Sequence, residues 1–134
     1  MKSILANDGM DASGIERLTA AGFNVQTQAI PQSELATYIN TYNIDALVVR
    51  SATKVRKELI EACPQLKIIA RGGVGMDNID VAFAESKGIQ VINTPAASSR
   101  SVAELVFAHA FSAVRFLYQS NREMPVQELQ LLTN

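Results

Sequence analysis

The sequence has few of the residues that build disulfide, metal or redox centres. Its 134 residues include one cysteine, Cys63, and one histidine, His109. A single cysteine excludes an internal disulfide framework, and no set of His, Cys, Asp or Glu residues has the spacing of metal ligands. We therefore expect no disulfide and no metal site, and acid–base chemistry by histidine would have to use His109.

The sequence also has no excess of one charge and no leader segment. The net charge is −1, from 12 Lys and Arg against 13 Asp and Glu, which gives no electrostatic basis for binding nucleic acid or an anionic membrane. The start, MKSILANDGM, lacks the long apolar run of a signal peptide, so the expected location is the cytoplasm. The length and the apolar content of 48% are typical of one domain with a real core.

Short apolar runs alternate with helix signals along most of the chain. The strands predicted from these runs are residues 3–6, 23–27, 46–49, 66–70 and 89–92. The helices predicted between them are residues 13–21, 31–39 opened by Pro31, 55–62 capped by Thr53, and 80–86. This alternation predicts an α/β fold, with a flavodoxin-like doubly wound parallel sheet of about five strands.

A long apolar helix is predicted over residues 101–118. Ser101 and Glu104 have the spacing of a capping box at its start. A helix that is apolar nearly all round must be covered nearly all round, so we expect two bodies to enclose it. His109 and Arg115 interrupt the run and no charged anchors flank it, which argues against a membrane span.

Polar or glycine-rich residues follow four of the predicted strands. They are Asn7-Asp8, Arg50-Ser51, Arg71 to Gly75, and Asn93 to Pro95. Because the carboxyl ends of parallel strands share one edge of the sheet, we expect these residues to meet there.

The loop Gly72-Gly73-Val74-Gly75 is the sharpest of these features. It suits either an anion nest of inward-pointing amides or a tight turn that needs positive φ, and the residues alone do not decide between them. It is not a dinucleotide fingerprint, because Asn78 stands where the third glycine belongs. The Arg50 fork suits a carboxylate or phosphate, although a plain surface arginine would look the same.

The remaining candidates favour structural roles. We interpret Asp77 and Asp80 as helix caps, His109 as a packed or partly buried side chain, and Cys63 as structural. The residues by themselves therefore predict positive, amide-rich groups for a small anion, with no base, nucleophile or redox centre.

Three ordered motifs resemble the D-isomer-specific 2-hydroxyacid dehydrogenases. They are RGGVGMDNID at 71–80, VINTP at 91–95 and SVAELVF at 101–107. The segment VRSATKV at 49–55 is similar to the family members that oxidise phosphoglycerate in serine biosynthesis.

The resemblance implies an NAD-dependent oxidoreductase and assigns roles to residues. Residues 1–97 would be part of a substrate-binding domain, 98–120 a long interdomain helix, and 121–134 a tail. The loop of Gly73, Val74 and Gly75 would bind the carboxylate of a small 2-hydroxy or 2-keto acid, with Val74 near the nicotinamide. Arg50 and Ser51 would lie near the other end of the substrate, and Val102 close to the cofactor.

Two departures from the family pattern qualify this expectation. Ser98 stands where a second asparagine is common, so no role is transferred to it. The family's Gly-x-Gly-x-x-Gly loop and its catalytic arginine, glutamate and histidine would follow residue 134, and His109 is not that histidine. We therefore expect no catalytic residue here, an inactive isolated chain, and a helix 101–118 that is covered by an NAD-binding Rossmann domain or a homodimer partner.

Two other classes of protein are alternatives to a dehydrogenase fragment. A receiver-like regulatory module would need an acidic residue after the third strand and a lysine after the fifth, but Arg50 and Asn93 stand there. The other alternative is a binding module that associates with itself through the apolar helix.

Overall fold

The computed structural model describes residues 1–124, so residues 125–134 of the predicted tail lie outside the described part. The chain divides into two compact units, Met1–Ala96 and Ala97–Asn134.

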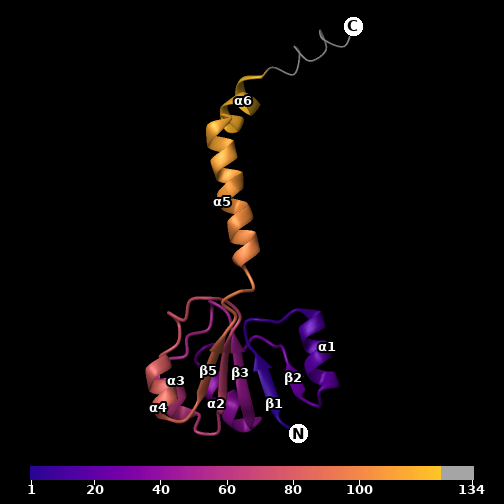
Figure 1. Ribbon diagram of the computed structural model, residues 1–134. Helices are drawn as coiled ribbons and strands as arrows, with labels where there is room; N and C mark the ends of the chain where they lie inside the picture. The colour runs from indigo at the N-terminus through magenta and orange to yellow at the C-terminus, as the bar shows by residue number, and fades with distance from the viewer. Residues whose placement is uncertain (125–134) are drawn as a thin grey trace. The chain divides into compact units, whose positions relative to one another are not determined.

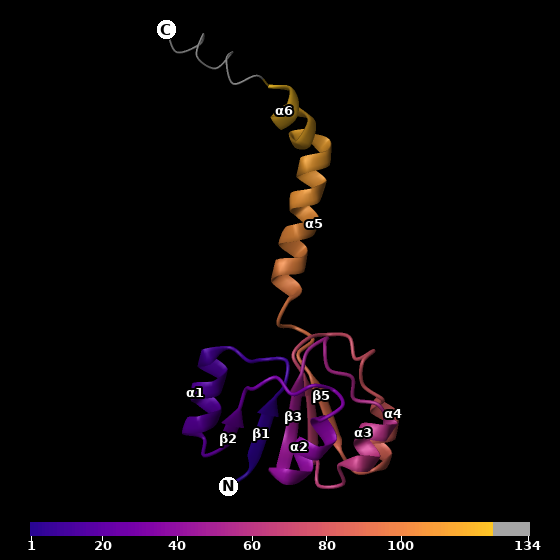
Figure 2. The same ribbon diagram turned by 180° about the vertical axis from the view of Figure 1, so that it is seen from behind.

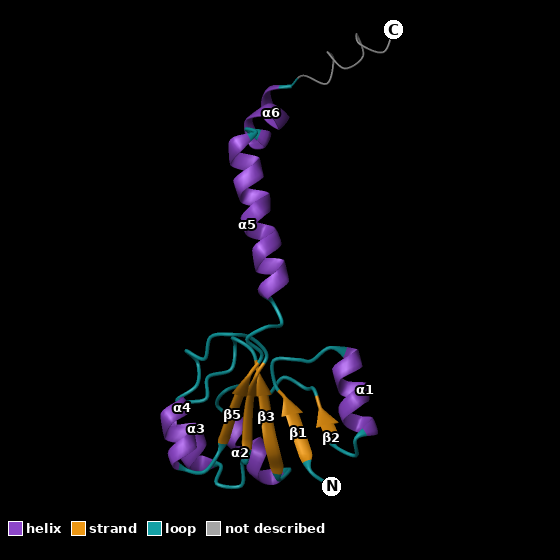
Figure 3. Cartoon of the chain, in the orientation of Figure 1, coloured by secondary structure: helices purple, strands orange, loops and turns teal. Residues whose placement is uncertain are grey.

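A parallel sheet forms the first unit (Figures 1 and 3). Its strands are β1 (Ser3–Ala6), β2 (Asn24–Gln26), β3 (Ile44–Val49), β4 (Ile68–Arg71) and β5 (Gln90–Asn93). Their order across the sheet is β2-β1-β3-β4-β5, with every neighbouring pair parallel. This is the flavodoxin-like doubly wound order, so the predicted fold class is confirmed.

Four helices connect these strands. They are α1 (Ala12–Ala20), α2 (Leu35–Thr41), α3 (Lys57–Ala62) and α4 (Val81–Ser86). Both views place α1 at the β2 end of the sheet, with α3 and α4 toward the β5 end (Figures 1 and 2).

The two faces of the sheet are covered to different degrees. Leu5, Leu47 and Ile69 are in register on one face, and each is fully buried in the core. The neighbouring row on the other face contains Val48 and Ile92. Val48 is half-buried and Ile92 is 46% exposed. The helices of this unit therefore build a closed core on one face and leave the other partly open.

Two of the predicted helix starts are wrong. Pro31 precedes a turn rather than a helix, and α2 begins only at Leu35. Gln32 exchanges two hydrogen bonds with the backbone of Lys54, which hold this segment against the next loop. Thr53 caps no helix, because its side chain is buried between Asn7 and Asp8.

The start of α3 is stabilised by a residue from a distant segment. The backbone N–H of Lys57 donates to Asp80 Oδ2 at 3.1 Å, and Arg56 Nη1 donates to Asp80 Oδ1 at 2.9 Å. Asp80 thus serves the helix before it in the chain, while it makes no side-chain cap bond to α4. Asp80 therefore binds a free amide at a helix start, as predicted, but the helix is α3 and not α4.

The described part of the second unit, residues 97–124, contains two helices where the sequence predicts one. They are α5 (Ser99–Val114) and α6 (Leu117–Glu123), with a 55° bend between them. Phe116 has φ of 53°, a left-handed conformation that ends α-helical hydrogen bonding. The predicted capping box is also wrong, because Ser101 lies inside α5 and Glu104 accepts from Arg100 Nε at 2.9 Å.

The apolar side chains of α5 are not buried within their own unit. Phe107 and Phe111 are each 62% exposed and Val114 is 72% exposed. Within residues 1–124 no single helix is long and apolar enough to cross a membrane, although α5 and α6 together reach that length and composition.

Candidate functional site

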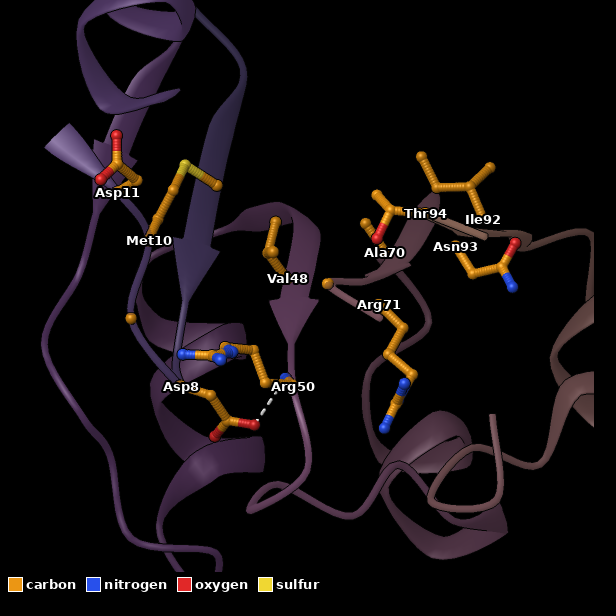
Figure 4. Close-up of a pocket in the computed structure, with 12 residues that line it drawn as sticks. Asp8, Met10, Asp11, Val48, Arg50, Ala70, Arg71, Ile92, Asn93 and Thr94 are labelled. Carbon is orange, nitrogen blue, oxygen red and sulfur yellow. Dashed lines mark hydrogen bonds between the residues drawn. The ribbon is translucent and has the colours of Figure 1, made fainter. Parts of the chain in front are cut away.

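A cleft of about 700 Å³ opens at the carboxyl edge of the sheet. The ends of β1, β3, β4 and β5 supply its polar rim, and the open sheet face supplies its apolar floor (Figure 4). The rim residues include Asp8, Arg50, Arg71, Gly72 and Asn93. The predicted meeting of strand-end residues at one edge is therefore found in the structure.

The other predicted site residues lie outside this cleft lining. Ser51 is exposed in the turn after Arg50, and Val74 is half exposed in the loop after β4. Gly73 and Gly75 belong to that same loop. Val102 belongs to the second unit, where it is 55% exposed on α5.

The glycine loop does not use positive φ. Gly72, Gly73 and Gly75 all lie outside the left-handed region, so the interpretation as a turn needing positive φ is wrong. The amides of Gly72 and Gly73 are consumed by hydrogen bonds to Val49 O at 2.8 Å and Arg71 O at 3.0 Å.

The next two amides of this loop, those of Val74 and Gly75, have no partner within residues 1–124. Two bonds hold the loop against the end of β5: Thr94 N–H donates to Gly73 O at 3.0 Å, and Asn93 Nδ2 donates to Val74 O at 2.7 Å. The loop therefore presents two adjacent N–H donors from a fixed backbone, and a carboxylate is the kind of group that such donors bind.

A side chain at position 73 would displace the side chain of Arg71. A Cβ there would meet the Arg71 guanidinium, whose Nη1 and Cζ lie in its place, Cζ at 3.1 Å. At Gly72 the nearest atom to an added Cβ is Arg50 Cγ at 3.5 Å, an ordinary van der Waals contact. The Arg71 side chain thus folds back over its own loop.

Asp8 binds the turn that carries Arg50. Its Oδ2 accepts from Arg50 N–H at 2.6 Å and from Thr53 N–H at 3.1 Å, and its Oδ1 accepts from the Thr53 hydroxyl. Partial burial raises the pKa of Asp8, but the hydrogen bonds from Thr53, Arg50 and Ala52 outweigh it, so the pKa lies below its usual value. Asp8 is thus a carboxylate at neutral pH.

Asn78 is a functional candidate that the sequence did not single out. Its Nδ2 donates to Arg50 O at 2.9 Å and to Thr53 O at 2.8 Å, while its Oδ1 accepts from Arg71 Nε at 3.2 Å. Sequence reasoning noted this residue only as the replacement of a fingerprint glycine. Its local spacing carries no signal of these contacts, because two of its partners come from a segment 25 and 28 residues earlier.

The remaining chemical candidates show no reactive environment. Burial raises the pKa of the Cys63 thiol to about 11, which keeps it protonated, in agreement with the predicted structural role. His109 is exposed within its unit, so the expected packing is not found there. The described residues contain no cluster of three or more groups that could hold a metal ion.

Known proteins of one family match this chain along nearly its whole length. The family model of the D-isomer specific 2-hydroxyacid dehydrogenase catalytic domain matches residues 4–123. A hydroxypyruvate reductase from Thermotoga maritima is 45% identical over 112 residues, which are 83% of this chain and 36% of that protein. A D-3-phosphoglycerate dehydrogenase from Methanocaldococcus jannaschii is 41% identical over 124 residues, 92% of this chain and 23% of that protein.

Solved structures extend the match to three dimensions. The NAD+-bound 3-phosphoglycerate dehydrogenase of Entamoeba histolytica has a TM-score of 0.67 to this chain at 29% identity, covering 84% of this chain and 38% of that one. The chain thus spans well under half the length of each relative named here. From the match over residues 4–123 and these relatives, the chain belongs to the D-isomer-specific 2-hydroxyacid dehydrogenase family.

Proposed function

We propose that this chain is the substrate-binding part of an NAD-dependent D-2-hydroxyacid dehydrogenase, and that its acid is D-3-phosphoglycerate or a close analogue. The observation that carries the proposal is the pair of amides at Val74 and Gly75, which have no partner among residues 1–124 and lie beside a cleft whose rim contains Arg50 and Arg71. Several relatives are named for phosphoglycerate and one for hydroxypyruvate, which supports a small anionic substrate.

The residues divide the substrate between them. The Val74 and Gly75 amides hold the carboxylate, and Gly73 lets the loop turn beneath it without displacing Arg71. Arg50 and Ser51 serve the opposite end, where a guanidinium suits a phosphate better than a hydroxyl would. Each of these groups binds or orients, and none takes the proton from the substrate hydroxyl.

NAD supplies the hydride acceptor when it is bound. Relatives with solved structures are named for bound NAD+ or NADPH, which supports a nicotinamide cofactor in the parent enzymes. Val74 and Val102 are the residues of this chain that we assign to its neighbourhood. The part that binds the nucleotide and the proton-transferring residues belong to a further domain, so this chain supplies orientation rather than the chemical step.

The exposed face of α5 is where we place that further domain. Its apolar residues Phe107, Phe111 and Val114 leave a large uncovered surface in their own unit, and such surfaces mark contacts with another body. A second copy of the chain is the alternative occupant. A cytoplasmic location stays a prediction from the sequence.

The function is tested by titrating the chain with D-3-phosphoglycerate and following backbone amide signals by NMR. We expect the largest shifts at Val74 and Gly75, and about tenfold weaker binding in Arg50→Ala, because one charge-assisted contact is lost. Shifts scattered over the surface, or equal binding by Arg50→Ala, would reject the proposed site. With NAD added, the chain alone should form no NADH.

A further inference from the structure

The main chain of Arg50 is held on both sides by side chains from distant segments. Its N–H donates to Asp8 Oδ2 at 2.6 Å, and its carbonyl accepts from Asn78 Nδ2 at 2.9 Å. Asp8 follows β1, Arg50 follows β3 and Asn78 lies after β4. Both peptide groups of one exposed residue are thus fixed by the neighbouring strand ends.

The same two side chains fix the other end of the turn. Asp8 accepts from the Thr53 N–H and hydroxyl, while Asn78 donates to the Thr53 carbonyl at 2.8 Å. Thr53 is itself 3% exposed and accepts from Asn7 Nδ2 at 2.8 Å. The turn from Arg50 to Thr53 is therefore anchored at both ends, although the side chains of Arg50 and Ser51 are exposed.

Asn78 also connects this turn to the second arginine. Its nitrogen binds the turn, and its oxygen accepts from Arg71 Nε at 3.2 Å. In Figure 4 the Arg50 side chain extends toward the segment of Asp8 and Met10, whereas Arg71 extends away from it. The side-chain amide of Asn78 thus binds the backbone of one arginine and the guanidinium of the other. The two guanidinium groups leave neighbouring strands in different directions.

We propose that Asp8 and Asn78 are positioning residues, which clamp the turn 50–53 and so aim Arg50 and Arg71 for anion binding. The proposal rests on the proposed function of the cleft as a site for a carboxylate or phosphate. An arginine on a loose turn would lose conformational entropy when it bound, and the clamp removes that cost beforehand.

If Asp8 positions the turn, removing its charge should weaken anion binding. If Asp8 acts only through its charge, the same change should strengthen anion binding. A carboxylate beside an anion site repels the anion, so removing its charge alone would tighten binding. Asp11 provides the matched control, because it lines the same cleft and its side chain bonds only to Ser13 within residues 1–124. Removing the Asp11 charge should leave the turn 50–53 intact.

The test compares Asp8→Asn with Asp11→Asn in the 134-residue chain, with oxalate as the probe. We expect Asp8→Asn to weaken oxalate binding by roughly three- to tenfold, the range for loss of one ordinary hydrogen bond. Asp11→Asn should bind oxalate equally or more tightly. Tighter binding by both variants would overturn the proposal, since Asp8 would then act only as a repelling charge.

A second measurement needs no ligand and so separates this proposal from the proposed function. In the free protein, Asp8→Asn should move the Arg50 and Thr53 amide signals and speed their hydrogen exchange. Asn78→Asp should do the same by losing its donor, while its carboxylate can still accept from Arg71 Nε. If both variants show these responses while the wild type does not bind oxalate, the clamp stands and the anion site fails. Unchanged Arg50 signals in both variants would overturn the clamp.

Discussion

Single residues at the carboxyl edge are placed by contacts from far along the chain. Thr53 has the sequence signature of a helix cap, yet it is buried and bonded to Asp8, 45 residues earlier. Asn78 lies inside the RGGVGMDNID motif, but the residue types of that motif do not indicate that it binds Arg50, Thr53 and Arg71. Which residues these side chains bind depends on which strands are neighbours in the sheet. The local spacing of residues along the chain does not specify that order.

A methyl group added at Gly73 should displace the Arg71 side chain, whereas one added at Gly72 should displace nothing. Gly73→Ala places a Cβ against the Arg71 guanidinium, so we expect Arg71 to move and to lose its bond to Asn78. Oxalate binding should fall by roughly threefold or more, with little change in stability because a flexible side chain absorbs the clash. Gly72→Ala should match the wild type, and equal effects of the two variants on the Arg71 Nε–H signal would contradict this reasoning.

Acid should destabilise the fold through its paired aspartates. The Lys67 side chain and the Ser3 amide lower the pKa of Asp45 below 3.8, the value of a free side chain. A depressed folded pKa contributes stability above the unfolded value, and this stability is lost as pH falls from about 4 through the folded pKa.

Urea unfolding measured between pH 7 and pH 2.5 checks this expectation. Stability should fall below about pH 4, and Asp45→Asn should be less stable than wild type at pH 7 but show a smaller loss in acid. An acid loss as large in Asp45→Asn as in wild type would show that other groups carry the effect.

At the scale of the element, two adjacent residues of β3 show that one face of the sheet is more deeply buried than the other. Leu47 faces the closed core and is fully buried, whereas Val48 faces the open side and lines the cleft. Their order along the chain shows only an apolar run. The run correctly predicts a strand of the parallel sheet, but a wholly apolar run is typical of a strand covered on both faces, and here the helix layout closes only one face.

Truncating these two residues should have unequal consequences. Leu47→Ala should cost about 2–5 kcal/mol of unfolding free energy, since it leaves a cavity in the closed core. Val48→Ala should cost about 1 kcal/mol or less, because solvent or a ligand can occupy the space. Urea unfolding of both variants gives the comparison, and equal losses would mean that the open face is as closely packed as the core.

The long helix ends before the composition of the segment would predict. Residues 101–118 are largely apolar, but α5 ends at Val114 and Phe116 adopts a left-handed conformation. Nothing in the residue types at 114–117 resembles a glycine stop signal. The extent of the apolar segment could be predicted from the sequence, and the position of its break could not.

At the scale of the whole molecule, the chain contains one closed core and one exposed apolar helix. Among residues 1–124, all buried core residues lie between Ile4 and Ile89, in the first unit. The second unit buries no residue of α5, where Phe107 and Phe111 stack with ring centroids 6.3 Å apart. An uncovered aromatic pair of this kind favours association.

Replacing that pair by charge should therefore reduce self-association without unfolding the sheet. For Phe107→Glu/Phe111→Glu we expect a lower average mass by sedimentation equilibrium, because a charged surface is costly to bury. The urea midpoint of the sheet should stay within experimental error of the wild type, since its core lies in the other unit. A wild type that is monomeric at high concentration would contradict the expected association.

The sequence by itself determined the fold class, the strand order and the edge where the polar residues gather. These follow from apolar periodicity and from the right-handed crossovers that parallel strands require. Only the tertiary structure decided that Thr53 and Asp80 serve distant segments, that the Val74 and Gly75 amides have no partner in the described part of the chain, and that Asn78 binds both Arg50 and Arg71. Hydrogen bonds between residues more than 20 positions apart arise from strand neighbours in space, and no local pattern of residue types specifies them.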